Sequence, residues 1–234
     1  MYYDLHTHSA LSPCADDDMT PNNMVNMAAL KGLSILGVTD HNACANVRAA
    51  IAVGRAAGVI VVPGMELTTA EEIHVLCLFP DADAAEAFAR EVYDVLPPIE
   101  NRTDIFGNQL VMNEDDEVVA CEPRLLLTAI SVGIYDVPAL VEPYGGVAIL
   151  AHIDRHSNGV LGILADIDPG MGYHLAEVSR NASADDYAAR YPFLRFLSDS
   201  DAHTLADLAD PGPDNVLPDD LSGAGEIIAF LRKK

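Results

Sequence analysis

Short apolar runs recur along the chain and predict seven strands. The runs cover residues 2–5, 33–38, 59–62, 75–79, 147–150, 174–178 and 193–197. Most of them end in a polar residue of a type that binds metals, whereas His74 precedes its run. Polar residues at the carboxyl ends of strands are typical of a βα-barrel, which builds its site there.

Helical patterns separate many of these runs. Residues 22–31 follow Thr20 and Pro21, which are suited to capping and starting a helix. Residues 46–57 end at Gly58, and residues 84–96 end at two prolines. Strands that alternate with helices predict parallel pairing with right-handed crossovers. We expect a further helix over residues 221–234 to close the fold.

The alternation stops between about residues 96 and 144. Residues 106–119 predict two short strands around an acidic turn, and residues 125–141 predict a helix. We interpret this stretch as an insertion within one domain that covers residues 1–234. It serves either as a lid over the site or as a structural elaboration, and the sequence leaves both open.

The net charge of −23, with only three lysines, argues against a nucleic-acid polymer as the partner, because such a surface repels phosphate backbones. The four cysteines form no CxxC pair, which favours reduced thiols. Neither a signal peptide nor an apolar stretch long enough to span a bilayer is present in the sequence. We therefore expect a cytoplasmic protein that does not bind membranes.

Histidines are concentrated at the predicted strand ends. His6 and His8 lie two residues apart, so in a strand they point to one face and can converge on one metal. Six of the eight histidines have such positions, namely His6, His8, His41, His74, His152 and His203. Oxygen ligands are available in Asp16, Glu66 and Asp201. Imidazole and carboxylate without paired thiolates suit zinc, manganese or iron, so we predict a site for several metals.

These residues occur in ordered motifs that resemble the polymerase and histidinol phosphatase (PHP) superfamily. The motifs are Asp4-Leu5-His6-Thr7-His8-Ser9, Thr39-Asp40-His41-Asn42, Gly64-Met65-Glu66, Ala151-His152 and Ser200-Asp201-Ala202-His203. The resemblance covers the chain apart from residues 96–144. It implies an α/β fold, a distorted (β/α)7 barrel with a small insertion between strands 4 and 5, and a centre of up to three divalent metal ions.

Carried over residue by residue, the resemblance implies nine metal ligands. The first metal would take His6, His8, Glu66 and Asp201, and Glu66 would bridge to a second metal held by His74 and His152. The third metal would take Asp16, His41 and His203. The family usually has Ser-Asp-Gly where this chain has Ser12-Pro13-Cys14-Ala15-Asp16-Asp17-Asp18. The five-residue distance to Pro21 favours Asp16 as the ligand, although Asp17 and Asp18 stay open as alternatives. Ordinary packing is the simpler interpretation of Cys14.

The charges of such a centre favour an anionic substrate, because three divalent ions outweigh three carboxylate ligands. We therefore expect hydrolysis of a small phosphate ester by a metal-bound hydroxide that attacks phosphorus in line. Asp201 is the candidate that orients or deprotonates the water, and Glu66 is the bridging carboxylate. Arg155 and Arg180 follow strand ends and are candidates for phosphate contacts, although surface ion pairs would also explain them.

Two other functions fit the same motifs. An amidohydrolase-type metallohydrolase also begins with paired histidines, but it often bridges its metals with a carboxylated lysine. None of Lys31, Lys233 and Lys234 lies at the end of a predicted barrel strand. A catalytically silent metal-binding module with a regulatory role is the second alternative, although such a module would be expected to lose ligands. The identity of the substrate and of the metal stays open.

Overall fold

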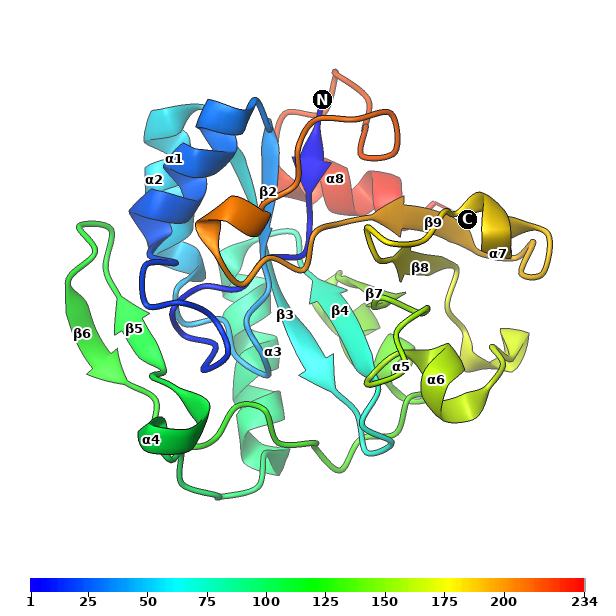
Figure 1. Cartoon of the computed structure of the whole chain (residues 1–234), viewed down its shortest axis with the longest axis horizontal. Helices are drawn as coiled ribbons and strands as arrows, with labels where there is room; N and C mark the ends of the chain where they lie inside the picture. The colour runs from blue at the N-terminus through cyan, green and yellow to red at the C-terminus, as the bar shows by residue number, and fades with distance from the viewer. Residues whose placement is uncertain (234) are drawn as a thin grey trace.

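Seven strands form one curved sheet that is nearly closed into a barrel (Figure 1). The computed structural model describes residues 1–233. The strand order is β1-β2-β3-β4-β7-β8-β9. The strands are β1 (Tyr3–Asp4), β2 (Ile35–Val38), β3 (Ile60–Thr68), β4 (His74–Leu78), β7 (Val147–Leu150), β8 (Leu175–Val178) and β9 (Arg195–Ser198). Each predicted strand is present, which confirms the α/β barrel.

One strand of the barrel runs against its neighbours. The strands β1, β2 and β3 are parallel to each other, as are β7, β8 and β9, whereas β4 pairs antiparallel with both β3 and β7. Only residues 69–73 join β3 to β4, and so short a connection makes a hairpin because a parallel crossover needs a dozen or more residues. The expectation of parallel pairing is therefore wrong at β4. The start of β4 lies at the edge where β3 ends.

The first and last strands approach each other just past their carboxyl ends. Thr7 and Ala202 form a parallel bridge, and the amide of His8 donates to the carbonyl of Ala202 at 2.9 Å. The carboxylate of Asp199 accepts from the amide of Leu5 at 2.5 Å. The first ligand motif, which contains His6 and His8, and the last one, which contains Asp201 and His203, therefore lie side by side.

The strands alternate between two hydrophobic cores. In β4, for example, Leu76 and Leu78 pack into the core inside the barrel, while Val75 and Cys77 pack into the core between the sheet and its helices. Helix α8 (Ala224–Leu231) adds Ile228 to the inner core, so it covers one end of the barrel. This confirms the predicted closing helix, although its expected end at Lys234 lies outside the described residues.

The outer helices match the predicted patterns closely. They are α1 (Pro21–Lys31), α2 (Val47–Ala57) and α3 (Ala82–Val95). Thr20 caps α1 by accepting from the amide of Asn23, and Gly58 ends α2 in the left-handed conformation. Over residues 1–233, no helix is both long and apolar enough to cross a lipid bilayer.

Shorter helices complete the chain. They are α4 (Thr103–Phe106), α5 (Val137–Val141), α6 (Val160–Leu164) and α7 (Asp185–Ala188), with 3-10 turns η1 (Glu142–Tyr144), η2 (Pro169–Met171) and η3 (Leu205–Asp207).

The prediction of a helix over residues 125–141 is wrong except at its end, where α5 forms. The backbone of residues 126–132 instead bonds to the rim of the barrel, where Ile130 donates to Thr68 and Val132 accepts from Ala70. These tertiary hydrogen bonds outweigh the local helical pattern.

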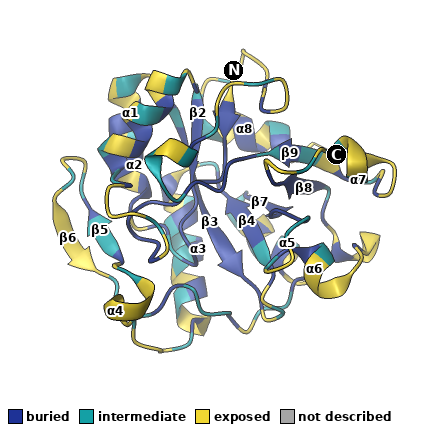
Figure 2. Ribbon diagram, in the orientation of Figure 1, coloured by how far each residue is buried: buried dark blue, intermediate teal, exposed yellow. Residues whose placement is uncertain are grey.

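The insertion contains the predicted pair of short strands, β5 (Leu110–Met112) and β6 (Val118–Cys121). Every residue of β6 is exposed, whereas the barrel strands are mostly buried (Figure 2). Gly107 has a φ of 100°, and a Cβ there would lie 2.1 Å from the carbonyl oxygen of Pro13. Glycine thus lets the insertion pack tightly against the loop that follows His8.

Candidate metal centre

Glu66 lies at the centre of a buried group of imidazoles. The side chain is 1% exposed, on a strand position that faces the barrel interior. Nitrogens of five histidines lie within 3.3 Å of its two oxygens. The Oε1 atom is 2.8 Å from His74 Nδ1, 3.0 Å from His152 Nε2 and 3.3 Å from His6 Nε2. The Oε2 atom is 3.1 Å from His41 Nδ1 and 3.3 Å from His8 Nε2. The predicted bridging carboxylate is therefore shared by ligands from four separate segments.

Asp201 forms a second convergence point beside Glu66. Its Oδ1 lies 3.0 Å from His8 Nε2 and 3.2 Å from His6 Nε2, and the two histidine nitrogens are 3.2 Å apart. Asp201 has a φ of 52° and His152 has a φ of 27°, which non-glycine residues seldom adopt. Backbone conformations of this kind cost free energy and often occur at functional sites.

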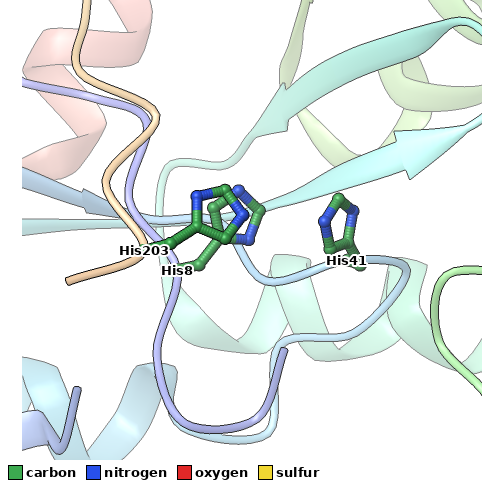
Figure 3. Close-up of side chains that lie close together, drawn as sticks. All are labelled: His8, His41 and His203. Carbon is green, nitrogen blue, oxygen red and sulfur yellow. The ribbon is translucent and has the colours of Figure 1, made fainter. Parts of the chain in front are cut away.

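Three overlapping sets of side chains could each hold a metal ion. They are His6, His8, Glu66 and Asp201; His41, Glu66 and His74; and His8, His41 and His203. The last set is shown in Figure 3, with the rings of His8 and His203 stacked at a centroid distance of 4.3 Å. The Nδ1 atoms of His41 and His152 are buried without a hydrogen-bond partner. A divalent cation fits these donors, because neutral imidazoles and carboxylates are its usual ligands.

Neighbouring side chains orient two of the imidazoles. Glu177 Oε2 is 2.7 Å from His6 Nδ1, and the hydroxyl of Ser12 is 3.0 Å from His8 Nδ1. Ser12 in turn donates to the carboxylate of Asp40 at 2.7 Å. A hydrogen bond from Nδ1 leaves Nε2 of each ring to bind a metal once Nε2 has lost its proton.

Sequence reasoning missed Glu177, which is 0% exposed inside the barrel. Its signal was a lone carboxylate within an otherwise apolar strand, a place where an acid needs a partner. Asp40 supports the imidazole of His8 through Ser12. Asp199, which follows the last strand, accepts from the amide of Leu5.

The titratable groups of the site strongly shift one another's pKa values. Burial alone would lower the pKa of His8, but hydrogen bonds to Asp201 and Glu66 raise it to about 9. Burial and the nearby His8 lower the pKa of His203 to about 4. Burial alone would raise the pKa of Glu66 and Asp201, yet the imidazoles around them hold each well below its ordinary value. Both carboxyl groups are therefore ionised at neutral pH, as a cation requires.

The remaining predicted residues lie at the edge of the site. Arg155 Nη1 is 2.5 Å from Asp201 Oδ2. Arg180 instead donates to the carbonyls of Ser200 and Asp207, both at 3.2 Å. Asp16 is exposed, and its side chain belongs to none of the three sets, although its amide donates to the carbonyl of His203 at 3.0 Å.

Comparison with known families identifies the architecture. A model of the PHP domain matches residues 4–191, which include six of the eight converging side chains and end just before the last strand. The chain belongs to the PHP domain family. This confirms the resemblance drawn from the sequence motifs. Among curated proteins, no sequence matches the chain significantly.

Solved structures share the PHP fold at low sequence identity. Lesion-specific endonuclease Q from Pyrococcus furiosus has a TM-score of 0.64 and 18% identity, over 87% of this chain and 48% of its own. A candidate metal-dependent phosphoesterase from Bifidobacterium adolescentis has a TM-score of 0.62 and 18% identity, over 99% and 96%. An amidohydrolase from Chromobacterium violaceum has a TM-score of 0.59 and 18% identity, over 99% and 97%. The chain thus spans about half the length of endonuclease Q, and these likenesses show the fold alone.

Replacing Glu177 with glutamine is expected to weaken metal binding roughly 10- to 100-fold. The amide keeps the size of the side chain but loses the negative charge that fixes the His6 tautomer. Zinc affinity measured by competition with a chelating dye checks this. Glu114→Gln, on the exposed turn of the insertion, is the matched control. Equal affinities for the two variants would show that Glu177 does not position His6.

Metal affinity is also expected to rise as the pH increases from 7 to 9. Because the pKa of His8 lies at about 9, its imidazole holds a proton at pH 7 that a cation must displace. His203, with a pKa of about 4, is already neutral and adds no dependence in this range. Each displaced proton strengthens apparent affinity roughly tenfold per pH unit. Dye competition at several pH values measures the slope, and a flat profile would contradict the assignment.

Proposed function

We propose that this PHP domain is a metal-dependent phosphoesterase that hydrolyses a small phosphate ester at a centre of up to three divalent ions. The observation that carries the proposal is the sharing of Glu66 between two of the three candidate metal sets. A carboxylate in that position can hold two cations a few ångströms apart. Clustered divalent cations supply an activated water and stabilise the attacking and leaving oxygens of an in-line displacement at phosphorus.

Eight side chains would hold the metals in this proposal. They are His6, His8, His41, Glu66, His74, His152, Asp201 and His203. A ninth ligand would come from the loop of residues 12–18, where the family pattern favours Asp16. Zinc, manganese and iron all suit nitrogen and oxygen donors of this kind.

Asp201 has a second role in the proposal. Its Oδ1 faces His6 and His8, and its Oδ2 pairs with Arg155. The low pKa of this carboxyl keeps it ionised, so it can accept a hydrogen bond from a water and orient it. The side chain is largely buried, so few competing waters surround it.

Arg155 is the proposed phosphate contact. Its ion pair with Asp201 keeps a guanidinium beside the metal ligands, in a chain with few cations. Arginine can bind two phosphate oxygens at once. Arg180 stays a second candidate, although its hydrogen bonds run to Ser200 and to Asp207 in η3.

The alternatives predict different outcomes in one substrate screen. Lys31 pairs with Asp210, and within residues 1–233 the charged partners of Glu66 are imidazoles. A glutamate rather than a carboxylated lysine would then bridge the metals, which favours phosphoester hydrolysis over amidohydrolase chemistry. All six predicted histidines converge, which disfavours a silent module. The acidic chain favours a small substrate over DNA, yet endonuclease Q has been crystallised with a duplex carrying an abasic lesion at its active site. Abasic DNA therefore belongs in the screen beside monoesters, diesters, amides and lactones.

Replacing His6 with alanine, or Asp201 with asparagine, is expected to reduce hydrolysis of an activated aryl phosphate by more than about 100-fold. Each change alters a candidate ligand of the set formed by His6, His8, Glu66 and Asp201. Phosphate release by zinc- or manganese-loaded protein is the measurement. His174→Gln is the control, because this imidazole bonds to the carbonyl of Leu231 in α8. A metal-loaded wild type that is inert on every phosphoester would refute the proposal.

Replacing Arg155 with alanine is expected to raise KM about 10-fold or more, since charge-assisted hydrogen bonds contribute about 1.5–3 kcal/mol. Arg155→Lys should restore part of the binding because it keeps the charge but loses the paired donors. Steady-state kinetics on metal-loaded protein, with metal content measured in parallel, tests this. Unchanged KM and kcat in the alanine variant would remove Arg155 from the substrate site.

A further inference from the structure

Asn46 stands at the start of α2 but does not cap this helix. Asparagine at such a position usually accepts a hydrogen bond from the first turn of its own helix, whereas the Asn46 side chain makes no such bond. The residue is 0% exposed and reaches the insertion instead. Its Oδ1 accepts from the amide of Met112 at 2.8 Å, and its Nδ2 donates to the carbonyl of Leu110 at 3.0 Å. Because a backbone amide only donates and a carbonyl only accepts, β5 fixes the direction in which this side-chain amide points.

The other hydrogen of the Asn46 amide is donated to a serine next to His8. Nδ2 lies 2.9 Å from the hydroxyl oxygen of Ser9, which also accepts from the amide of Leu11 at 3.2 Å. Both acceptor positions of this hydroxyl are thereby filled. Its own hydrogen is therefore donated to Asp40 Oδ2, which lies at 2.6 Å.

Asp40 accepts hydrogen bonds from two serines. Besides the hydroxyl of Ser9, it accepts from the Ser9 amide at 2.8 Å and from the hydroxyl of Ser12 at 2.7 Å. Ser12 has a single hydroxyl hydrogen, and this bond to Asp40 uses it. The Ser12 oxygen accepts from the amide of His41 at 3.1 Å, which leaves one acceptor position for His8.

The donors of this network place a hydrogen on one particular nitrogen of His8. Its Nδ1 lies 3.0 Å from the Ser12 oxygen, and it must donate because Ser12 has no further hydrogen to offer. Its Nε2 lies 3.0 Å from Asp201 Oδ1 and 3.3 Å from Glu66 Oε2. The network thus keeps Nε2 as the nitrogen that can bind a cation between these carboxylates.

Burial makes the members of the network depend on one another. Ser12, Asp40 and Asn46 are 0% exposed, and Ser9 is 1% exposed. Solvent cannot replace a partner that is lost at such positions, and an unpaired buried polar group is costly. One arrangement of donors is therefore favoured from β5 to the His8 ring.

We propose that Asn46 is a positioning residue of the metal centre, which connects the backbone of β5 to the His8 ring and fixes Nε2 as its metal-binding nitrogen. The insertion thereby supports the centre without supplying a ligand. This inference rests on the metal centre of the proposed function. It deepens that function by giving a residue outside the ligand motifs a role in metal affinity.

The hydrogen on His8 can be observed in the wild-type protein by nuclear magnetic resonance. Proton–nitrogen correlation spectra of zinc-loaded protein with isotopically labelled histidine assign the protonated nitrogen of each ring, and comparison with His8→Gln identifies the signals of His8. We expect hydrogen on Nδ1 and zinc on Nε2. Zinc on Nδ1 would overturn the proposal. This measurement decides even where a variant does not fold.

Asn46→Asp tests the connection to the insertion. The carboxylate keeps the acceptor for Met112 but loses the donors to Leu110 and Ser9, so the Ser9 hydroxyl can turn away from Asp40. Zinc affinity is expected to fall about fivefold in dye competition, because partners beyond the ligands commonly affect metal affinity.

Gln109→Glu is the matched control. Gln109 is 2% exposed, and its amide donates to the carbonyls of Glu122 and Arg124 at 2.8 and 2.7 Å, while its Oε1 accepts from the amide of Leu126. The same chemical change therefore removes two donors within the insertion without touching the network. Thermal stability should fall in both variants, whereas zinc affinity should fall only in Asn46→Asp. Equal zinc affinities in the two variants would contradict a positioning role.

A double variant tests whether Asn46 acts through Ser9. Ser9→Ala removes the hydroxyl between Asn46 and Asp40, so adding Asn46→Asp should weaken zinc binding no further. Additive losses would show that Asn46 does not reach His8 by this route and would overturn the proposal. A protein that gives the expected spectrum and affinities but hydrolyses no phosphoester would retain this inference and lose the proposed function.

Discussion

The burial of one carboxylate among five imidazoles is the interaction on which the rest of this structure depends. Glu66 is 1% exposed, and an isolated anion at such a position would be strongly destabilising. Its neighbours are held by separate segments of the chain, so the barrel must close before they can meet. Cations bound between these groups would offset the cost of burying them, so metal binding would be coupled to stability.

The surroundings of the site are built to keep the ligands in place. Glu177 orients His6 from inside the barrel, and Ser12 with Asp40 orients His8. The insertion supports the same loop from outside, where Gly107 packs on the carbonyl of Pro13. These contacts anchor the insertion to the loop that follows His8. Rigid support of this kind is what a metal centre needs to fix ligand geometry.

The reversed strand β4 explains the one candidate ligand, His74, that departs from the sequence pattern. His74 precedes its apolar run, whereas the other histidine ligands follow theirs. Since β4 is antiparallel to β3 and β7, its first residue lies at the edge where those strands end. His74 therefore pairs in register with Thr68 and reaches Glu66 at 2.8 Å. The position of His74 at the start of its strand was therefore a sign in the sequence that β4 runs antiparallel to its neighbours.

The helix predicted over residues 125–141 does not form apart from α5, again because of contacts between distant segments. Its residues satisfy their backbone groups by bonding to the rim loops, including the side chain of Asn42, which donates to the carbonyls of Leu126 and Thr128. Local periodicity carries no information about such distant partners. The same limit applies to Glu177, whose role became visible only when β8 brought it beneath His6.

The sequence by itself determined the seven strands, the outer helices and eight residues that converge, because apolar periodicity and ordered ligand motifs are local properties. Only the tertiary structure decided the direction of β4, the orienting role of Glu177 and the placement of the loop that carries Cys14 and Asp16. Each of these depends on contacts between segments far apart in the chain. The spacing of residues 12–18 could rank their carboxylates, but only the fold showed that the Ser12 side chain of that loop contacts His8.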